Sequence, residues 1–283
     1  MAVKLASNRY GKHQVRVSKI RRPRQAAPNT ERHEFIEVAV DVELEGDFET
    51  AFTEGDNSSV VATDTCKNTV YVLAKDHPLD TVESFGVAVA EHFVAQYPHV
   101  SHCTASLTER VWDRLQDSPH GFTAGAATPT AAVSLERGGE PVVTAGVEKL
   151  LIAKTTESGF TNFHRDEYRT LVDTEDRILA TELSSTWKYA SAAGVDFAAA
   201  RKSILDALLA RFLDHYSVSV QETLFKMGEA ALGVCPDMSE ITLTMPNKHH
   251  ILANLNPFDR ENDNEVFVVT DEPFGYITGT VAR

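Results

Sequence analysis

Strict alternation of apolar and polar residues is the clearest pattern in the first part of the chain. The alternating apolar positions are Ile36, Val38, Val40, Val42 and Leu44. A period of two predicts a strand with one buried face. A weaker alternation runs through residues 12–20, and residues 23–32 between the two runs hold two prolines and an asparagine. Because that composition is typical of a loop, the sequence predicts a long antiparallel hairpin.

A helical period follows this hairpin. Apolar residues recur at three- and four-residue steps, at Val82, Phe85, Val89 and Phe93. That spacing places them on one face of a helix. Asp80, with Glu83 three residues later, is expected to cap the N-terminus of this helix. The same reasoning predicts helices at about 196–215 and about 221–234.

Further strands are predicted between and after these helices. Their approximate positions are 103–107, 131–135, 142–154, 178–189, 241–245, 251–255, 266–269 and 276–281. The order of strands, helices and strands occurs twice, which indicates an α+β chain of two similar halves. We place their domains at 1–140 and 141–283, each with an antiparallel sheet and helices on one face. Sheet edges and apolar outer faces favour closure by other subunits.

Charge and composition exclude several classes of protein. The 283 residues carry a formal net charge of −14, and an acidic surface repels phosphate backbones, so nucleic acid is not expected as the main partner. The three cysteines contain no Cys-x-x-Cys pair, which fits a reducing compartment. No apolar run reaches about 18 residues, so no membrane span is expected. With no apolar leader segment and no Ser-Lys-Leu terminus, a bacterial cytoplasmic location is expected.

Five separate stretches supply side chains that together suit one ligand class. They are Tyr10-Gly11-Lys12, Ala62-Thr63-Asp64, residues 160–177, Val220-Gln221 and Pro246-Asn247-Lys248-His249. A planar anion with carbonyl and N–H edges is held well by a guanidinium fork, an amide and a stacked ring. Arg177 and Gln221 fit the two edges, and Phe160 fits the stack. A lone phenylalanine is usually in the core and a lone arginine on the surface, so the inference depends on the joint pattern.

The pair His249-His250 raises the alternative of a metal site. Alternating strand geometry sends neighbouring residues to opposite faces, so the two imidazoles are not expected to share one ion. His249 with a distant carboxylate stays open as a metal pair. The chain has no dinucleotide-binding fingerprint, no P-loop and no metalloprotease or serine-hydrolase motif. We therefore expect neither a metal nor a cofactor.

The residues and the order of these stretches resemble those of the urate oxidase (uricase) family. The matching stretches are 154–160, 165–168 and 176–179, with 61–64, 67–71, 219–221 and 246–249. The resemblance extends from Tyr10 to Arg283. It implies two tandem tunnelling-fold halves that close into barrels in a homotetramer, with active sites at subunit interfaces. It also implies cofactor-free oxidation of urate by O2 and water to 5-hydroxyisourate and hydrogen peroxide, the first step towards allantoin.

The resemblance also implies a role for each candidate residue. Lys12 and Thr63 act as a base relay with His249, and Thr63 lies with a neighbouring subunit's Lys12 and His249. Burial away from water lowers the pKa of a lysine base, and a threonine hydroxyl both donates and accepts. Asp64 belongs to the substrate-binding set as a structural partner. In that set, Phe160 stacks on the purine, Arg177 and Gln221 clamp its edges, the Val220 backbone contacts it, and Asn247 holds O2 or water.

Two other functions remain open alternatives. Relatives of the same fold that act on pterins or GTP use zinc ligands, but the three cysteines here have no histidine neighbours in a motif. A purine-binding protein without turnover is the second alternative. Thr161-Asn162 stand where many members of the family have a bulky residue and a glycine, and this departure is expected to alter the loop beside Phe160. Cys66 is expected to be buried and inert.

Overall fold

The computed structural model describes residues 3–22 and 32–283, and the chain divides into two compact units. Unit 1 comprises Met1–Val147 and Lys188–Ala199. Unit 2 comprises Glu148–Trp187 and Ala200–Arg283. The loop predicted at 23–32 lies outside the described residues except for Arg32.

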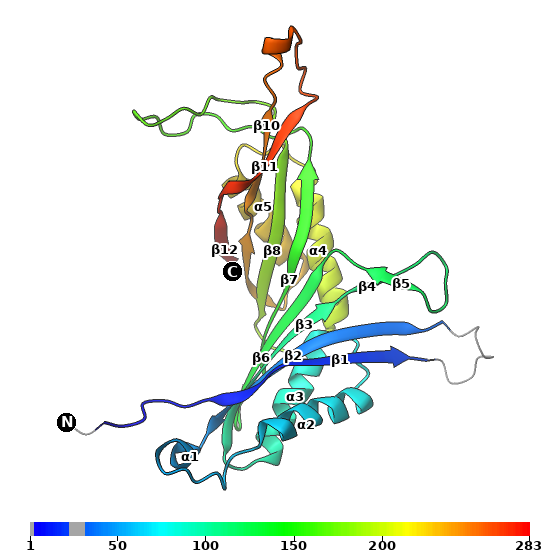
Figure 1. Ribbon diagram of the computed structural model, residues 1–283, viewed down its shortest axis with the longest axis vertical. Helices are drawn as coiled ribbons and strands as arrows, with labels where there is room; N and C mark the ends of the chain where they lie inside the picture. The colour runs from blue at the N-terminus through cyan, green and yellow to red at the C-terminus, as the bar shows by residue number, and fades with distance from the viewer. Residues whose placement is uncertain (1–2, 23–31) are drawn as a thin grey trace. The chain divides into compact units, whose positions relative to one another are not determined.

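Unit 1 is built on antiparallel strands that pair in the order β1, β2, β3 and β6 (Figure 1). The strands that begin in this unit are β1 (Tyr10–Arg21), β2 (Glu34–Gly46), β3 (Val100–Arg110), β4 (Trp112–Arg114), β5 (Phe122–Ala124), β6 (Thr128–Glu136) and β7 (Val142–Lys154). The alternating residues Val38, Val40, Val42 and Leu44 of β2 are at most 1 % exposed. The predicted strand with one buried face is confirmed.

The described residues of unit 1 form the helices α1 (Glu49–Thr53), α2 (Thr63–Asp76) and α3 (Val82–Gln96). Helix α3 packs on β3 and β6, and α2 packs on β1. The predicted apolar stripe of α3 is confirmed, because Phe85, Val89 and Phe93 are each 0 % exposed. At Gly86 an added Cβ would come within 2.8 Å of the Leu107 and Val133 side chains, so a larger residue here would force those side chains to shift.

The predicted cap of α3 is wrong by one residue. Thr81 is the N-cap, and its hydroxyl oxygen accepts the Ser84 backbone N–H at 3.2 Å. Asp80 instead forms an ion pair with Arg21 of β1. Both Thr and Asp can cap a helix, but here the Asp80 carboxylate is paired with the Arg21 guanidinium of β1.

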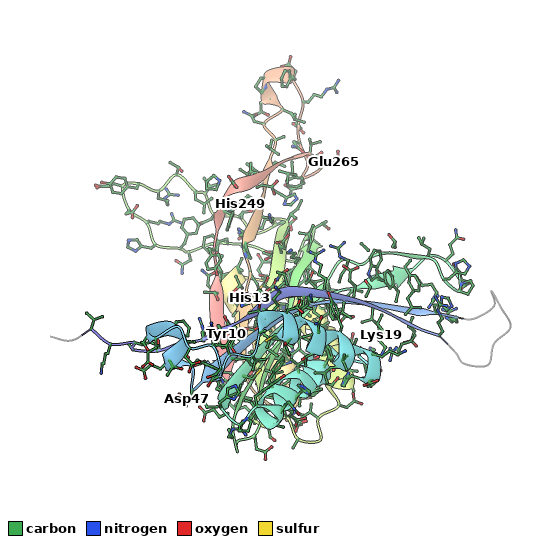
Figure 2. All side chains as sticks on the ribbon, turned by 60° about the horizontal axis from the view of Figure 1, so that its bottom comes forward. Tyr10, His13, Lys19, Asp47, His249 and Glu265 are labelled. Atoms are coloured by element: carbon green, nitrogen blue, oxygen red, sulfur yellow. The ribbon has the colours of Figure 1, made fainter. Side chains whose placement is uncertain are left out.

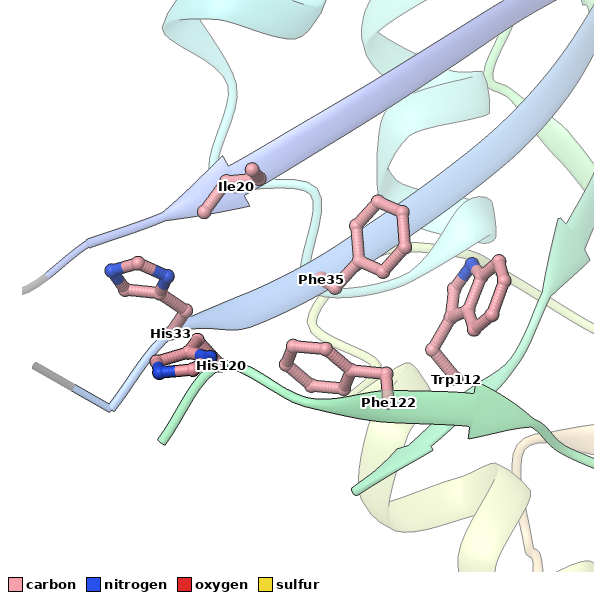
Figure 3. A pocket seen from close by; sticks show the side chains of 6 residues that line it. All are labelled: Ile20, His33, Phe35, Trp112, His120 and Phe122. Atoms are coloured by element: carbon pink, nitrogen blue, oxygen red, sulfur yellow. The ribbon is translucent and has the colours of Figure 1, made fainter. Parts of the chain in front are cut away.

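The small sheet of β4 and β5 is attached to β2 by an aromatic cluster (Figure 3). The rings of Phe35 and Trp112 stack with centroids 4.8 Å apart, and Phe122 lies 5.7 Å from Phe35. With Ile20, His33 and His120 these rings border a pocket of about 290 Å³. Ring pairs of this kind add about 0.5–1.5 kcal/mol beyond area burial, so they hold the hairpin against the main sheet.

Unit 2 also joins antiparallel strands to helices. Its elements are β8 (Leu179–Tyr189), α4 (Phe197–Leu213), α5 (Val220–Val234), β9 (Met238–Thr244), β10 (Asn247–Leu252), η1 (Asn256–Phe258), β11 (Phe267–Gly275) and β12 (Thr278–Ala282). Strand β10 pairs with β8 and β11, and β9 pairs with β12. Helix α5 packs on β9 and β12, with its Leu224, Met227 and Ala231 at most 5 % exposed.

The expected α+β class is confirmed at the level of antiparallel strands with a few packed helices. Within residues 3–22 and 32–283 no helix is long and apolar enough to cross a membrane. The pairing of two tunnelling-fold halves and the closure of barrels between subunits stay predictions.

Candidate active site

Four of the predicted site residues border one cavity in unit 2. Phe160, Arg177, Asn247 and His249 line a space of about 380 Å³. Phe160 lies in the segment between β7 and β8, Arg177 stands two residues before β8, and the other two lie on β10. In Figure 2, His249 lies on the β10 strand. The structure therefore brings together residues as far apart in the sequence as Phe160 and His249, which are separated by 89 positions.

The backbone fixes Phe160 firmly. Its N–H donates to the Thr174 carbonyl at 2.7 Å, and its carbonyl accepts the Thr174 N–H at 3.1 Å. The phenyl ring stacks on Phe163 with centroids 5.0 Å apart and 12° between planes. Asn162, part of the departure from the family pattern, has a left-handed φ of 56°, which asparagine tolerates better than most residues. Phe160 thus presents a supported aromatic surface at the cavity.

Arg177 is a half-buried cation with an N–H donor that is unpaired within the described chain. Its guanidinium carbon lies 5.3 Å from the centroid of the Phe160 ring. Burial lowers the pKa of Arg177, and only Tyr216 opposes that effect. Its Nε is buried and has no hydrogen-bond partner among the described residues. A buried donor without a partner is costly, so the side chain is suited to receive an anion.

Asn247 and His249 face each other across one position of β10. The Asn247 Nδ2 and His249 Nδ1 atoms are 3.4 Å apart. The register between β10 and β11 shifts between these two residues. His250, which strict alternation sends to the opposite face, also borders the cavity. Among the described residues no group of three or more His, Cys, Asp or Glu side chains is arranged to hold a metal ion.

Val220 and Gln221 do not border this cavity. They are the first two residues of α5, where Val220 is buried and Gln221 is exposed. Ser219 caps the helix, since its hydroxyl accepts the Glu222 N–H at 3.1 Å. The predicted amide edge of the clamp thus lies outside the lining of this cavity.

The remaining candidates lie in unit 1, around the start of α2. Thr63 is the first residue of that helix, and Asp64 is the second. The Asp64 carboxylate accepts hydrogen bonds from Lys67 Nζ at 2.5 Å and Asn68 Nδ2 at 2.9 Å. Lys67 lowers the pKa of Asp64 most, and the charge of Lys12 lowers it further. Lys12 thus lies near the helix N-terminus, and Asp64 is bonded to neighbours as a structural partner would be.

Tyr10 joins the strand of Lys12 to the segment before Thr63. Its hydroxyl oxygen accepts the Val61 backbone N–H at 2.7 Å, and its ring meets Phe48 edge-on at 4.8 Å. Burial raises the pKa of Tyr10 to about 12, so the phenol stays protonated. Figure 2 shows Tyr10 on β1. The link was not predicted from the sequence, although Tyr10 stands in the same short motif as Lys12.

The backbone around Lys12 is irregular. The register of β1 against β2 shifts between Lys12 and Val15. Within that shift Gln14 has a left-handed φ of 55°, and its N–H donates to Asp41 Oδ1 at 2.6 Å. At Gly11 an added Cβ would lie 1.7 Å from the Val42 carbonyl oxygen. A bulge of this kind re-aims side chains next to functional sites.

Cys66, one turn into α2, is 0 % exposed. Burial raises the pKa of its thiol to about 11. A protonated, inaccessible thiol is a poor nucleophile, so the expectation of a buried, inert cysteine is confirmed.

Comparison with known proteins decides the family. A family model described as Uricase matches residues 8–134 and 143–278. The chain belongs to the uricase family. The uricase of Arthrobacter globiformis is 41% identical over 281 residues, which cover 99% of this chain and 90% of that protein. The uricase of Dictyostelium discoideum is 36% identical over 285 residues, covering 99% and 97%.

Solved uricase structures agree with this assignment. The crystal structure of the Arthrobacter globiformis uricase matches with a TM-score of 0.92 and 40% identity, over 100% of this chain and 96% of that one. A uricase from Bacillus fastidious matches with a TM-score of 0.80 and 26% identity, over 98% and 94%. As a uricase, this chain is an oxidoreductase that oxidises urate. The resemblance seen in the sequence is confirmed.

Proposed function

We propose that this uricase converts urate, O2 and water to 5-hydroxyisourate and hydrogen peroxide without a cofactor, as the first step of urate degradation towards allantoin. Atoms balance, and urate supplies the two electrons that reduce O2 to peroxide. The observation that carries the proposal is the cavity in which the supported Phe160 ring meets the half-buried Arg177. An aromatic face beside an under-satisfied guanidinium suits a flat purine anion.

The urate clamp consists of Phe160, Arg177, Gln221 and the Val220 backbone. Phe160 stacks on the purine, and Arg177 and Gln221 bind opposite edges. Val220 opens helix α5, where the first backbone N–H groups lack partners inside the helix and suit a carbonyl or anionic edge. Asn247 positions O2 or water above the ring, and its place in the lining of the cavity that Phe160 also borders supports this role.

Proton transfer is assigned to Lys12, Thr63 and His249. Lys12 takes a proton from the substrate side through the Thr63 hydroxyl, which donates and accepts at once. His249 continues the relay, and Asp64 holds the start of α2. The nearness of Lys12 to Asp64 and the exposure of Thr63 support this grouping.

Two tunnelling-fold domains, 1–140 and 141–283, are proposed to assemble into a homotetramer with active sites at subunit interfaces. Exposed apolar side chains support an interface on β11, where Val268 is 53% and Val269 is 62% exposed. Apolar strands of this kind are normally covered by another chain. In such an assembly, Thr63 of one subunit would lie with Lys12 and His249 of its neighbour.

An aerobic urate assay tests the proposal. The purified protein, treated with a chelator and assayed in air-saturated buffer, is expected to remove the urate absorbance band and release one peroxide per urate. Arg177→Met should abolish saturable urate binding while the fold, followed by circular dichroism, persists. Urate that binds but is not consumed would establish a purine binder instead. Turnover that disappears with the chelator and returns with zinc would refute cofactor independence.

A further inference from the structure

The linker between α4 and α5, residues 214–219, is bonded to the loop that carries Phe160. Ser217 N–H donates to the Glu157 carbonyl at 2.9 Å, and the Ser217 carbonyl accepts the Gly159 N–H at 2.8 Å. The pair forms a short parallel bridge between Ser158 and Ser217. Any displacement of the linker therefore moves the stacking ring.

The same linker reaches the other members of the urate clamp. The Tyr216 hydroxyl donates to the Glu175 carbonyl at 2.6 Å, two residues before Arg177. Arg177 N–H in turn donates to the Ser158 carbonyl at 2.9 Å. Helix α5 starts with Val220 directly after the linker. The linker thus sets the placement of the Phe160 ring, the Arg177 guanidinium and the start of helix α5, which carries Gln221.

Buried hydroxyls and an imidazole hold the linker itself. Thr223 Oγ1 lies 2.5 Å from Ser217 Oγ and 3.2 Å from His215 Nε2. Ser217 and Thr223 are 0 % exposed. Lys154 Nζ adds a bond to the His215 carbonyl at 2.7 Å, from the end of β7. Thr223 is the group that connects the start of α5 to both ends of this cluster.

The direction of each bond in the cluster follows from its partners. His215 Nδ1 lies 2.6 Å from the Arg211 carbonyl, which only accepts, so Nδ1 carries the proton. Burial lowers the pKa of His215, so the ring is neutral and Nε2 accepts from Thr223. Thr223 must then accept from Ser217, whose other contact, to the Ser219 carbonyl, is longer at 3.2 Å. The Ser217 hydroxyl thus donates to Thr223, and the Thr223 hydroxyl donates to His215, a directed chain that orders the linker.

We propose that Thr223 is a positioning residue that sets urate affinity by holding the linker, and through it Phe160, Arg177 and Gln221, in register. The inference rests on the proposed function of that clamp. Thr223 does not border the cavity and acts through the backbone bonds of Ser217. Its influence is therefore expected in substrate binding and not in proton transfer.

The test compares Thr223→Val with Thr223→Ser and Thr280→Val. Valine keeps the shape of threonine but removes the hydroxyl, whereas serine keeps the hydroxyl. Thr280 is the control in unit 2, because its hydroxyl also bonds another side-chain hydroxyl, that of Thr242 at 2.7 Å, but at an exposed position away from the linker. Loss of the buried bonds is expected to raise the urate KM about fivefold to thirtyfold, with kcat within about threefold of wild type. Thr223→Ser should restore most of the affinity, and Thr280→Val should leave it unchanged.

An unchanged urate KM in Thr223→Val would overturn the proposal. If only kcat and the melting temperature fell, the role of Thr223 would be purely structural, and the proposal would likewise be overturned. Ser217→Ala provides a second variant if the first does not fold, and it should show the same shift in KM. Affinity for xanthine, a purine probe titrated without turnover, separates this inference from the proposed oxidation. Weaker xanthine binding in Thr223→Val supports the positioning role even if urate is not oxidised. Equal xanthine binding in both proteins refutes it even if urate is oxidised.

Discussion

Gly11→Ala is the sharpest test of how the chain delivers Lys12. The new Cβ would lie 1.7 Å from the Val42 carbonyl oxygen, 2.7 Å from the Val42 carbonyl carbon and 2.9 Å from Glu43 Cα. Real Cβ atoms stay beyond 3.0 Å, and all three obstacles are backbone atoms that cannot rotate away. Strands β1 and β2 must therefore separate at the pairs of Gly11 with Glu43 and Lys12 with Val42.

The expected loss of unfolding free energy is about 3–5 kcal/mol. Overpacking costs about 1–3 kcal/mol, and the disrupted backbone hydrogen bonds add about 1 kcal/mol each. Denaturant unfolding followed by circular dichroism measures this change as a lower midpoint. Because Lys12 follows directly in the strand, kcat should also fall by at least about tenfold.

Gly233→Ala is the matched control, since nothing lies within 4 Å of its added Cβ. Gly233 lies in helix α5, where alanine is favoured over glycine by up to about 1 kcal/mol. The same substitution should thus destabilise at one glycine and stabilise at the other. A Gly11→Ala protein with an unchanged midpoint and full turnover would refute the close approach of β1 to β2.

Three further outcomes are expected. Lys12→Met and Thr63→Ala should each lower kcat at least about 100-fold while the urate KM changes only a few-fold; equal losses in both would contradict the base role. Tyr10→Phe removes the acceptor of a backbone N–H at 2.7 Å and should lower the unfolding free energy by about 1 kcal/mol, measured by denaturant titration; an unchanged value would mean that the bond contributes nothing. Burial lowers the pKa of His215 below its ordinary 6.5, so the unfolded chain binds more protons near that pH and stability should decrease as pH falls from about 7 to about 5. His215→Gln should flatten that slope, and an unaltered slope would exclude His215 as its source.

Local patterns were enough to predict several elements of the fold. The period of β2 and the stripe of α3 were recognised because burial of one face imposes a period on the sequence. Helix α2 was missed. Its first turn contains Thr63, Asp64 and Thr65, which have modest helix propensity. It is stabilised by burial of Cys66 and Val70 against the rest of unit 1, and such tertiary contacts leave little local trace.

The sequence alone determined which chemical groups the site can use, since a guanidinium, an amide, an imidazole and an aromatic ring keep their properties wherever they lie. Which of them meet is a matter of distant contacts. Phe160, Arg177, Asn247 and His249 line one cavity, and Gln221, at the exposed start of α5, is outside that lining. The linker that connects them depends on Ser217 and Thr223, common residues whose hydroxyls gain meaning only when both are enclosed 2.5 Å apart. Which site residues come together is decided by packing between segments far apart in the chain, and no short stretch of sequence encodes that packing.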